Sequence, residues 1–89
     1  MFGTTNTDLG ASLFKTWDET QKRDEIAKLV EGYRAGVPVG ILCKMTETIA
    51  GNRKKARKHL RALMTTAERE AAVAGASGGL QTLVKEYLL

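Results

Sequence analysis

A cluster of cationic side chains is the most distinctive chemical feature of the sequence. Residues 53 to 61 hold six Lys or Arg side chains and no acid: Arg53, Lys54, Lys55, Arg57, Lys58 and Arg61. The rest of the chain carries eight basic and ten acidic side chains, so the net charge of +4 arises from this cluster. Like charges this close repel by a few tenths of a kcal/mol per pair, and phosphate groups would relieve that repulsion. The cluster therefore predicts binding to a polyanion.

Side chains suited to catalysis or to metal binding are few. One cysteine, Cys43, and one histidine, His59, cannot make a protein-only zinc site of four ligands. The chain has no glycine-rich phosphate loop, no dinucleotide-binding fingerprint and no elbow around a nucleophilic serine. We therefore expect no enzyme, cofactor, metal or small-molecule substrate. Cys43 is expected to be buried, and His59 to lie at the rim of the basic segment or against phosphate.

The cationic cluster is expected to lie on one amphipathic helix running from Asn52, a good N-cap residue, to about Met64. Apolar residues recur at i, i+4, i+7 and i+8 in Ala56, Leu60, Leu63 and Met64. At about 100° per residue, the cations opposite this stripe are Lys54, Lys58 and Arg61, with Arg57 on the flank. The sequence thus predicts a helix with one side packed in the core and the opposite side cationic.

Apolar periodicity also predicts helices before the basic one. A short helix from Asp8 has one apolar side, made by Leu9, Leu13, Phe14 and Trp17. The next, capped by Thr16 or Asp18, ends near Gly36 and buries Ile26, Leu29, Val30 and Tyr33. These two segments could equally be one bent helix. Val37 and Pro38 open a further helix, which is predicted to bury Ile41, Leu42, Met45 and Ile49.

Two more helices are predicted after the basic one. The first is capped by Thr65 or Thr66 and ends at a flexible joint containing Gly75, Gly78 and Gly79. The last runs from Leu80 to Leu89 and gathers five apolar residues on one side: Leu80, Leu83, Val84, Tyr87 and Leu88. This stripe must dock on its own core or on another subunit, and we take it as a candidate oligomer interface.

The chain of 89 residues is predicted to be all-α, a small bundle of about five helices with no strand. We expect a flexible arm over residues 1–7, a helical domain over 8–76, and the glycine joint with the C-terminal helix over 77–89. No apolar run is long enough to cross a bilayer, and the N-terminus lacks the features of a secretory signal. With a single cysteine, this favours a cytoplasmic site of action.

Residues 36–64 carry a family resemblance. The stretch from Gly36 to Leu63 resembles the helix-turn-helix core of winged-helix and related DNA-binding proteins, over 28 of the 89 residues. Residues 65–89 read as helices, so no wing is evident. In that superfamily, residues matching Ala56, Leu60 and Leu63 pack on the preceding helix. The resemblance implies that five others face the major groove or its phosphates: Asn52, Arg53, Lys54, Arg57 and Lys58.

The leading hypothesis is therefore a small nucleic-acid-binding protein, a regulator or a DNA-packaging adaptor that works as a homo-oligomer. DNA is the expected polymer, and RNA stays open. If four to six cations touch phosphates, log K should fall with log salt at a slope of roughly −4 to −5. The alternative is a structural assembly protein, of the viral head or connector type, whose basic helix contacts an acidic neighbour. Two further interpretations of the basic helix remain. It could be a solvated face that keeps the protein soluble, or a helix that lies on a membrane surface, which we rank last.

Overall fold

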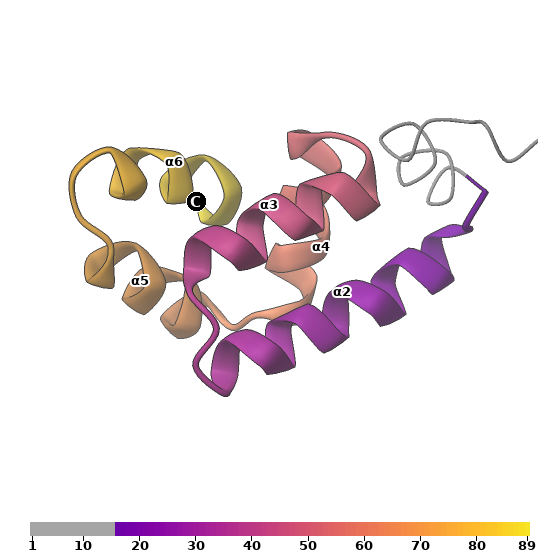
Figure 1. The fold of residues 1–89 in the computed structure, drawn as a ribbon, viewed down its shortest axis with the longest axis horizontal. Coiled ribbons are helices and arrows are strands. Elements are labelled where there is room, and N and C mark those ends of the chain that lie inside the picture. Colours follow the sequence, from indigo (N-terminus) through magenta and orange to yellow (C-terminus); the bar gives the residue numbers. More distant parts are fainter. Residues whose placement is uncertain (1–15) are drawn as a thin grey trace, which may run out of the picture.

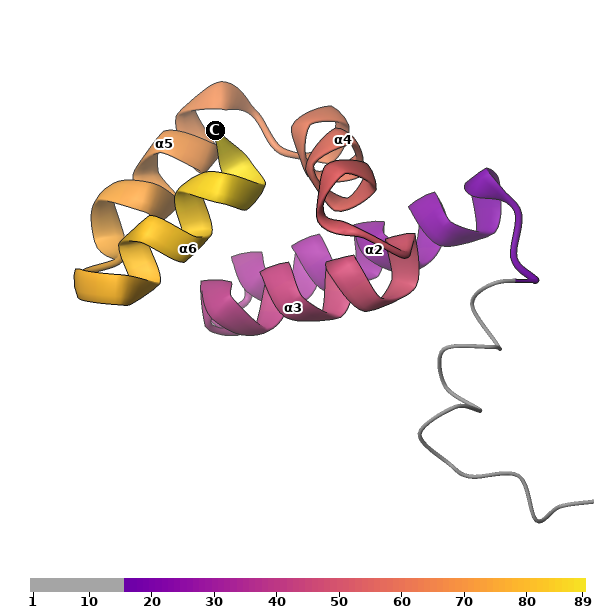
Figure 2. The ribbon, with the colours of Figure 1, turned by 90° about the horizontal axis from the view of Figure 1, so that it is seen from above.

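The computed structural model describes residues 16–89, where all regular structure is helical. The helices are α2 (Glu19–Arg34), α3 (Val39–Ala50), α4 (Arg53–Leu63), α5 (Thr66–Gly75) and α6 (Gly78–Leu88). Figures 1 and 2 show α2 and α3 side by side with α4 across them, and α5 paired with α6 at the other end. The expected all-helical bundle is confirmed. The predicted arm over 1–7 and most of the helix from Asp8 lie outside the described residues.

None of the helices within residues 16–89 is both long and apolar enough to span a membrane. The longest of them, α2, has 16 residues. It is also the helix with four acidic side chains, which a bilayer core would not accept: Glu19, Asp24, Glu25 and Glu31.

Two residues, Gly51 and Asn52, separate α3 from α4. Gly51 ends α3 with a φ of 105°, a left-handed conformation that glycine adopts without steric cost, and its N–H donates to the Glu47 carbonyl at 2.8 Å. The Asn52 side chain accepts from the Lys55 N–H at 2.8 Å and so caps α4. The predicted cap of the basic helix is confirmed, and the link between the two helices is tight.

Side-chain caps also begin α2 and α5, at one of the two residues expected for each. The Asp18 carboxylate accepts from the Gln21 N–H at 2.8 Å, while the Gln21 side chain accepts from the Asp18 N–H at 2.9 Å. Thr65 and Glu68 make the same reciprocal pair at the start of α5. Such capping boxes fix where a helix begins because they satisfy N–H groups that have no partner within the helix.

The core lies where α4 meets α2, α3 and α6. Its completely buried or nearly completely buried side chains come from all four helices: Ile26, Val30, Leu42, Cys43, Ala56, Leu60, Val84, Tyr87 and Leu88. The predicted buried stripe of the basic helix is confirmed at Ala56, Leu60 and Met64, and Leu63 is partly buried. Burial raises the pKa of the Cys43 thiol to about 11, so the thiol stays protonated at neutral pH.

α3 buries a different side from the one that its apolar pattern predicted. Leu42 and Ile49 are buried as expected, whereas Ile41 and Met45 are 48% and 47% exposed. Three small residues, Cys43, Thr46 and Ala50, occupy the interior instead. The reason is that α3 contacts α6 as well as α2 and α4, so its buried arc is turned toward α6. The prediction for Ile41 and Met45 was wrong.

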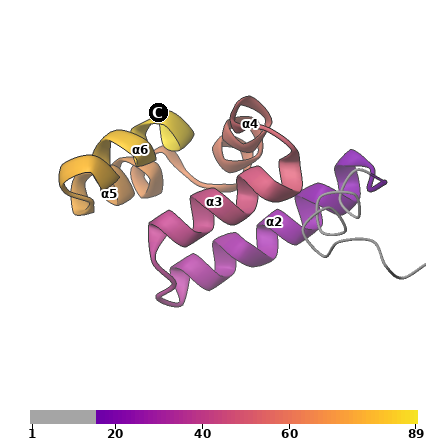
Figure 3. The same cartoon turned by 45° about the horizontal axis from the view of Figure 1, so that its top comes forward.

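α6 docks on its own chain, against α3, α4 and α5 (Figure 3). Val84, Tyr87 and Leu88 are completely buried there. Their assignment to an oligomer interface was therefore wrong, because the same protein chain already covers them. Of the five predicted interface residues, Leu83 is partly buried and Leu80 is 43% exposed.

The glycine joint is shorter than predicted. Gly75 is the last residue of α5, and Gly78 and Gly79 form the first turn of α6. Only Ala76 and Ser77 lie between the two helices. Gly78 has a φ of 58°, which accounts for a glycine at the start of α6.

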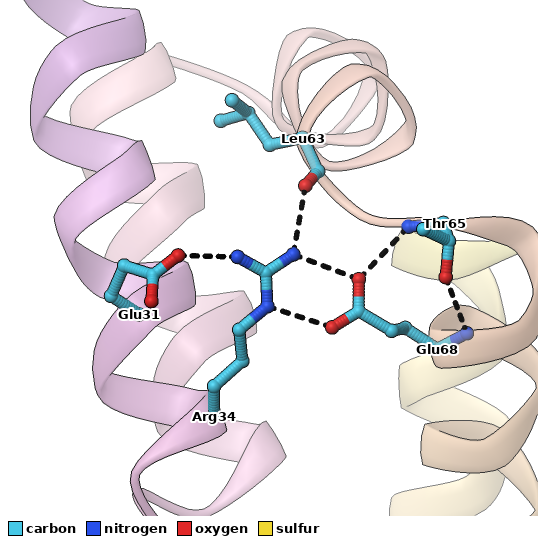
Figure 4. Close-up of polar contacts among 5 residues, drawn as sticks. All are labelled: Glu31, Arg34, Leu63, Thr65 and Glu68. Atoms are coloured by element: carbon cyan, nitrogen blue, oxygen red, sulfur yellow. Dashed lines mark hydrogen bonds and ion pairs between the residues drawn. The ribbon is translucent and has the colours of Figure 1, made fainter.

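Arg34 joins α2 to α5 (Figure 4). Its Nε and Nη2 donate to the two carboxylate oxygens of Glu68 at 2.7 and 2.8 Å, its Nη1 pairs with Glu31, and Nη2 also reaches the Leu63 carbonyl at 3.3 Å. The hydrogen bond from Arg34, followed by that from the Thr65 N–H, lowers the pKa of the Glu68 carboxyl to about 2. The bidentate pair of Arg34 and Glu68 holds the end of α2 against the start of α5.

Replacing Leu88 with Ala tests whether α6 belongs to the core. Because Leu88 is completely buried, we expect L88A to lower the free energy of unfolding by about 2 to 5 kcal/mol in urea denaturation. The control is L80A, which removes a 43% exposed leucine from the same helix and should have a much smaller effect. A change in oligomeric state for L88A, without loss of stability, would contradict this packing.

Candidate nucleic-acid interface

α4 has a buried side and a cationic side. Ala56, His59 and Leu60 face the interior at 1% exposure or less. Three cations occur at i, i+4 and i+7 on the opposite side of the helix, all exposed, and we call them the front row: Lys54, Lys58 and Arg61. They span roughly 10 Å along the helix axis at 1.5 Å per residue. The charge pattern predicted from the sequence is thus present on the surface.

The front row has no acidic partner within residues 16–89. Neither its three side chains nor the exposed Lys55 forms an ion pair or a side-chain hydrogen bond in that range. Seven ion pairs occur elsewhere in the same range, and they engage six of its carboxylates with other cations: Glu19, Glu25, Glu31, Glu47, Glu68 and Glu86. Four positive charges on α4 are therefore available to an external anion.

Arg53 is engaged by α3 and α6. Its Nη1 forms an ion pair with Glu86, its Nε lies 3.9 Å from a Glu47 carboxylate oxygen, and its guanidinium is 4.8 Å from the centre of the Tyr87 ring. The Tyr87 hydroxyl in turn donates to Glu47 at 2.5 Å. A cation over an aromatic face and between two carboxylates is stabilised by contacts with all three groups.

Arg57 occupies the same flank of α4, one turn after Arg53, and we call these two residues the flank row. Its Nη2 donates to the main-chain oxygen of Leu89 at 2.6 Å. Arg69 of α5 donates to the Leu88 carbonyl at 3.0 Å. Guanidinium groups at the end of α6 satisfy carbonyls that have no partner within the helix, and they complement its negative dipole end. The last turn of α6 therefore lies against the flank row.

His59 lies inside the bundle, so its expected position at the rim or on phosphate was wrong. Its Nδ1 accepts from Arg23 Nε at 2.9 Å, and its Nε2 lies 3.3 Å from a Glu19 carboxylate oxygen. Burial first, and then the charge of Arg23, lowers the pKa of the imidazole. A neutral ring with its proton on Nε2 satisfies both contacts. His59 thus links α4 to α2.

The residues predicted to bind nucleic acid divide into two groups. Lys54, Lys55, Lys58 and Arg61 are exposed, as is the capping residue Asn52 at the start of the same helix. Arg53 and Arg57 are half-buried and have partners on α3 and α6. Sequence reasoning missed the partners on and after α6, Glu86 and Leu89, because no local pattern connects residues more than thirty positions apart.

A second surface feature lies away from α4. A cleft of about 490 Å³ opens between the α2–α3 turn and α5, lined mainly by apolar and small side chains. The two charged side chains in its lining, Arg34 and Glu68, are paired with each other. Within residues 16–89 no group of three or more His, Cys, Asp or Glu side chains is placed to hold a metal ion. The cationic side of α4 is therefore the best-defined candidate site.

Comparisons with known proteins add no functional information. The chain matches no protein-family model, and no similar protein was found among curated sequences or solved structures. The resemblance to helix-turn-helix proteins thus stays a prediction from residues 36–64.

The single histidine offers a direct test of this geometry. Because the imidazole is buried beside Arg23, we expect its pKa, followed by proton NMR, to lie below the ordinary value of 6.5. A histidine whose pKa is lower in the folded state binds more protons when unfolded, so stability should fall as the pH drops below 6.5. Replacing Arg23 with Gln should raise the pKa. A titration midpoint at or above 6.5 in the wild-type protein would contradict the buried position.

Proposed function

We propose that this protein binds nucleic acid, with duplex DNA as the expected polymer, through the front row and Lys55 on α4. One observation carries the proposal: four exposed cations, three on the outer side and Lys55 on a flank, lie on a helix whose inner side is buried in the core, and none has a carboxylate partner in residues 16–89. A face that serves solubility mixes both signs of charge, and this one does not. The role proposed is that of a small regulator or DNA-packaging adaptor in the cytoplasm.

The shape of α4 supports a duplex partner. A helix with its side chains is about 10 to 12 Å wide, and the major groove of B-DNA is about 12 Å wide. The tight turn at Gly51 and Asn52 sets α4 across α3 (Figure 2). The side of α4 opposite its buried residues carries the exposed front row. A helix exposed along one whole side can enter a groove without rearrangement of the fold.

The aromatic residues support the same choice. Proteins that bind single strands stack bases on exposed aromatic rings. Among the described residues, Trp17 and Tyr33 are partly buried against the core, and Tyr87 is completely buried beneath Arg53. No exposed aromatic ring accompanies the cations in this part of the chain. Contact with phosphates and groove edges therefore fits the surface better than base stacking does.

The strength and salt dependence follow from the number of available cations. Each phosphate contact contributes about −0.9 to the slope of log K against log salt for duplex DNA. Four free cations on α4 therefore predict a slope of about −3.6. This is slightly less steep than the slope of roughly −4 to −5 expected from the sequence for four to six contacts, because Arg53 and Arg57 are already engaged by α6 and the residue that follows it.

A double substitution tests the proposal. Replacing Lys54 and Lys58 with Ala leaves the core untouched, because both side chains are exposed, and should reduce the slope to about −1.8 in fluorescence anisotropy titrations with duplex DNA. The matched control replaces two other exposed lysines, Lys28 and Lys44, and should leave the slope unchanged although the net charge falls equally. Equal effects of the two double variants on the slope would contradict the assignment of the DNA-binding site to α4.

A second candidate is the structural assembly protein, in which α4 contacts an acidic neighbouring subunit. It is favoured by four exposed apolar side chains on or near α3: Val37, Ile41, Met45 and Leu80. Leu80 lies over Gly40 of α3, since a Cβ built at Gly40 would be 3.3 Å from its Cδ1. Light scattering on the titration samples separates the two candidate functions. A stable oligomer whose mass does not change when DNA is added at low salt indicates the assembly protein.

A further inference from the structure

We infer that Glu86 on α6 sets the affinity for nucleic acid by withholding Arg53 from it, without touching the polymer itself. The inference rests on the proposed function of α4. Arg53 precedes Lys54 at the start of the helix and is exposed enough to reach an external anion, with 40% of its side chain accessible. Its charge is neutralised by a carboxylate of the same chain instead. Glu86 and a phosphate therefore compete for one guanidinium.

The pair is placed where such an exchange can occur. The Glu86 side chain is 50% exposed, so the ion pair with Arg53 lies at the surface and is screened by salt. Exposed ion pairs are individually weak, and a phosphate on DNA offers the same guanidinium a competing acceptor with release of counterions. Because Glu86 is itself exposed, loss of this ion pair leaves its carboxylate in contact with water.

The other contacts of Arg53 do not prevent this exchange. Glu47 lies 3.9 Å from Arg53 Nε, but its carboxylate also accepts from the Tyr87 hydroxyl, a hydrogen bond that does not involve Arg53. Arg53 Nε itself has no hydrogen-bond partner although it is buried. Glu86, in contrast, forms its side-chain ion pair within residues 16–89 with Arg53 alone. Neutralising Glu86 is therefore the change that frees Arg53 most cleanly.

The position of Arg53 makes it a useful fifth cation. It lies at the first residue of α4, where the unpaired N–H groups and the helix dipole also favour an anion. It shares a flank with Arg57 and stands beside Lys54 of the front row. A freed Arg53 would extend the cationic surface around the start of α4 from four charges to five.

The test compares E86Q with E70Q in the intact chain, using duplex DNA at several salt concentrations. Glu70 is exposed on α5 and has no ion pair within residues 16–89, so both variants remove one negative charge. We expect E86Q to steepen the slope from about −3.6 to about −4.5 and to tighten binding roughly fivefold to tenfold at 0.1 M salt. E70Q should keep the wild-type slope.

Substitution of Arg53 completes the test. In the wild-type background R53A should leave the slope near −3.6, whereas R53A added to E86Q should abolish the gain. A gain that survives in the double variant would mean that Glu86 simply repels phosphate, and equal gains for E86Q and E70Q would mean that only total charge matters. Weaker binding by E86Q would mean that the pair positions Arg53 for contact. Each of these results overturns the inference, while absence of salt-dependent binding in every protein overturns the proposed function itself.

Discussion

Burial of one side of α4 is the constraint on which the rest of the structure depends. Ala56 and Leu60 lie in the centre of the bundle, where α2, α3 and α6 all contact the same helix. His59 adds a polar link from α4 to α2 through Arg23. Once this side is fixed inside, the cations on the opposite side have no place except the surface. The fold thus converts a sequence pattern into a charged face of defined orientation.

The surrounding helices divide those cations. α6 and α3 neutralise Arg53 and cover the flank, while nothing described on the chain neutralises the front row. α6 therefore has two roles, since it completes the core through Val84 and Leu88 and reduces the number of free charges on α4. Under the proposed function, the same docking that stabilises the bundle also limits the affinity of the protein for nucleic acid. Stability and binding are coupled through one helix.

Local sequence signals predicted the helices, their caps and the buried side of α4. They could not predict the contacts between residues far apart in the chain. The caps and the buried stripe of α4 follow from residues within one or two turns, such as Asn52 with Lys55. The burial of Thr46 in place of Met45 depends on where α6 packs, which no periodicity in α3 reveals. Two partners of the flank row, Glu86 and Leu89, lie more than thirty residues away in the chain. Apolar spacing shows that a helix has a buried side, but the width and direction of that side depend on its neighbours.

The most direct test of the central claim is NMR mapping of the surface that duplex DNA covers. If the outer side of α4 is the interface, the side-chain signals of Lys54, Lys58 and Arg61 shift on titration, and those of Ile41 and Met45 on α3 stay unchanged. Shifts concentrated on α3, or no shifts at low salt, would contradict the account.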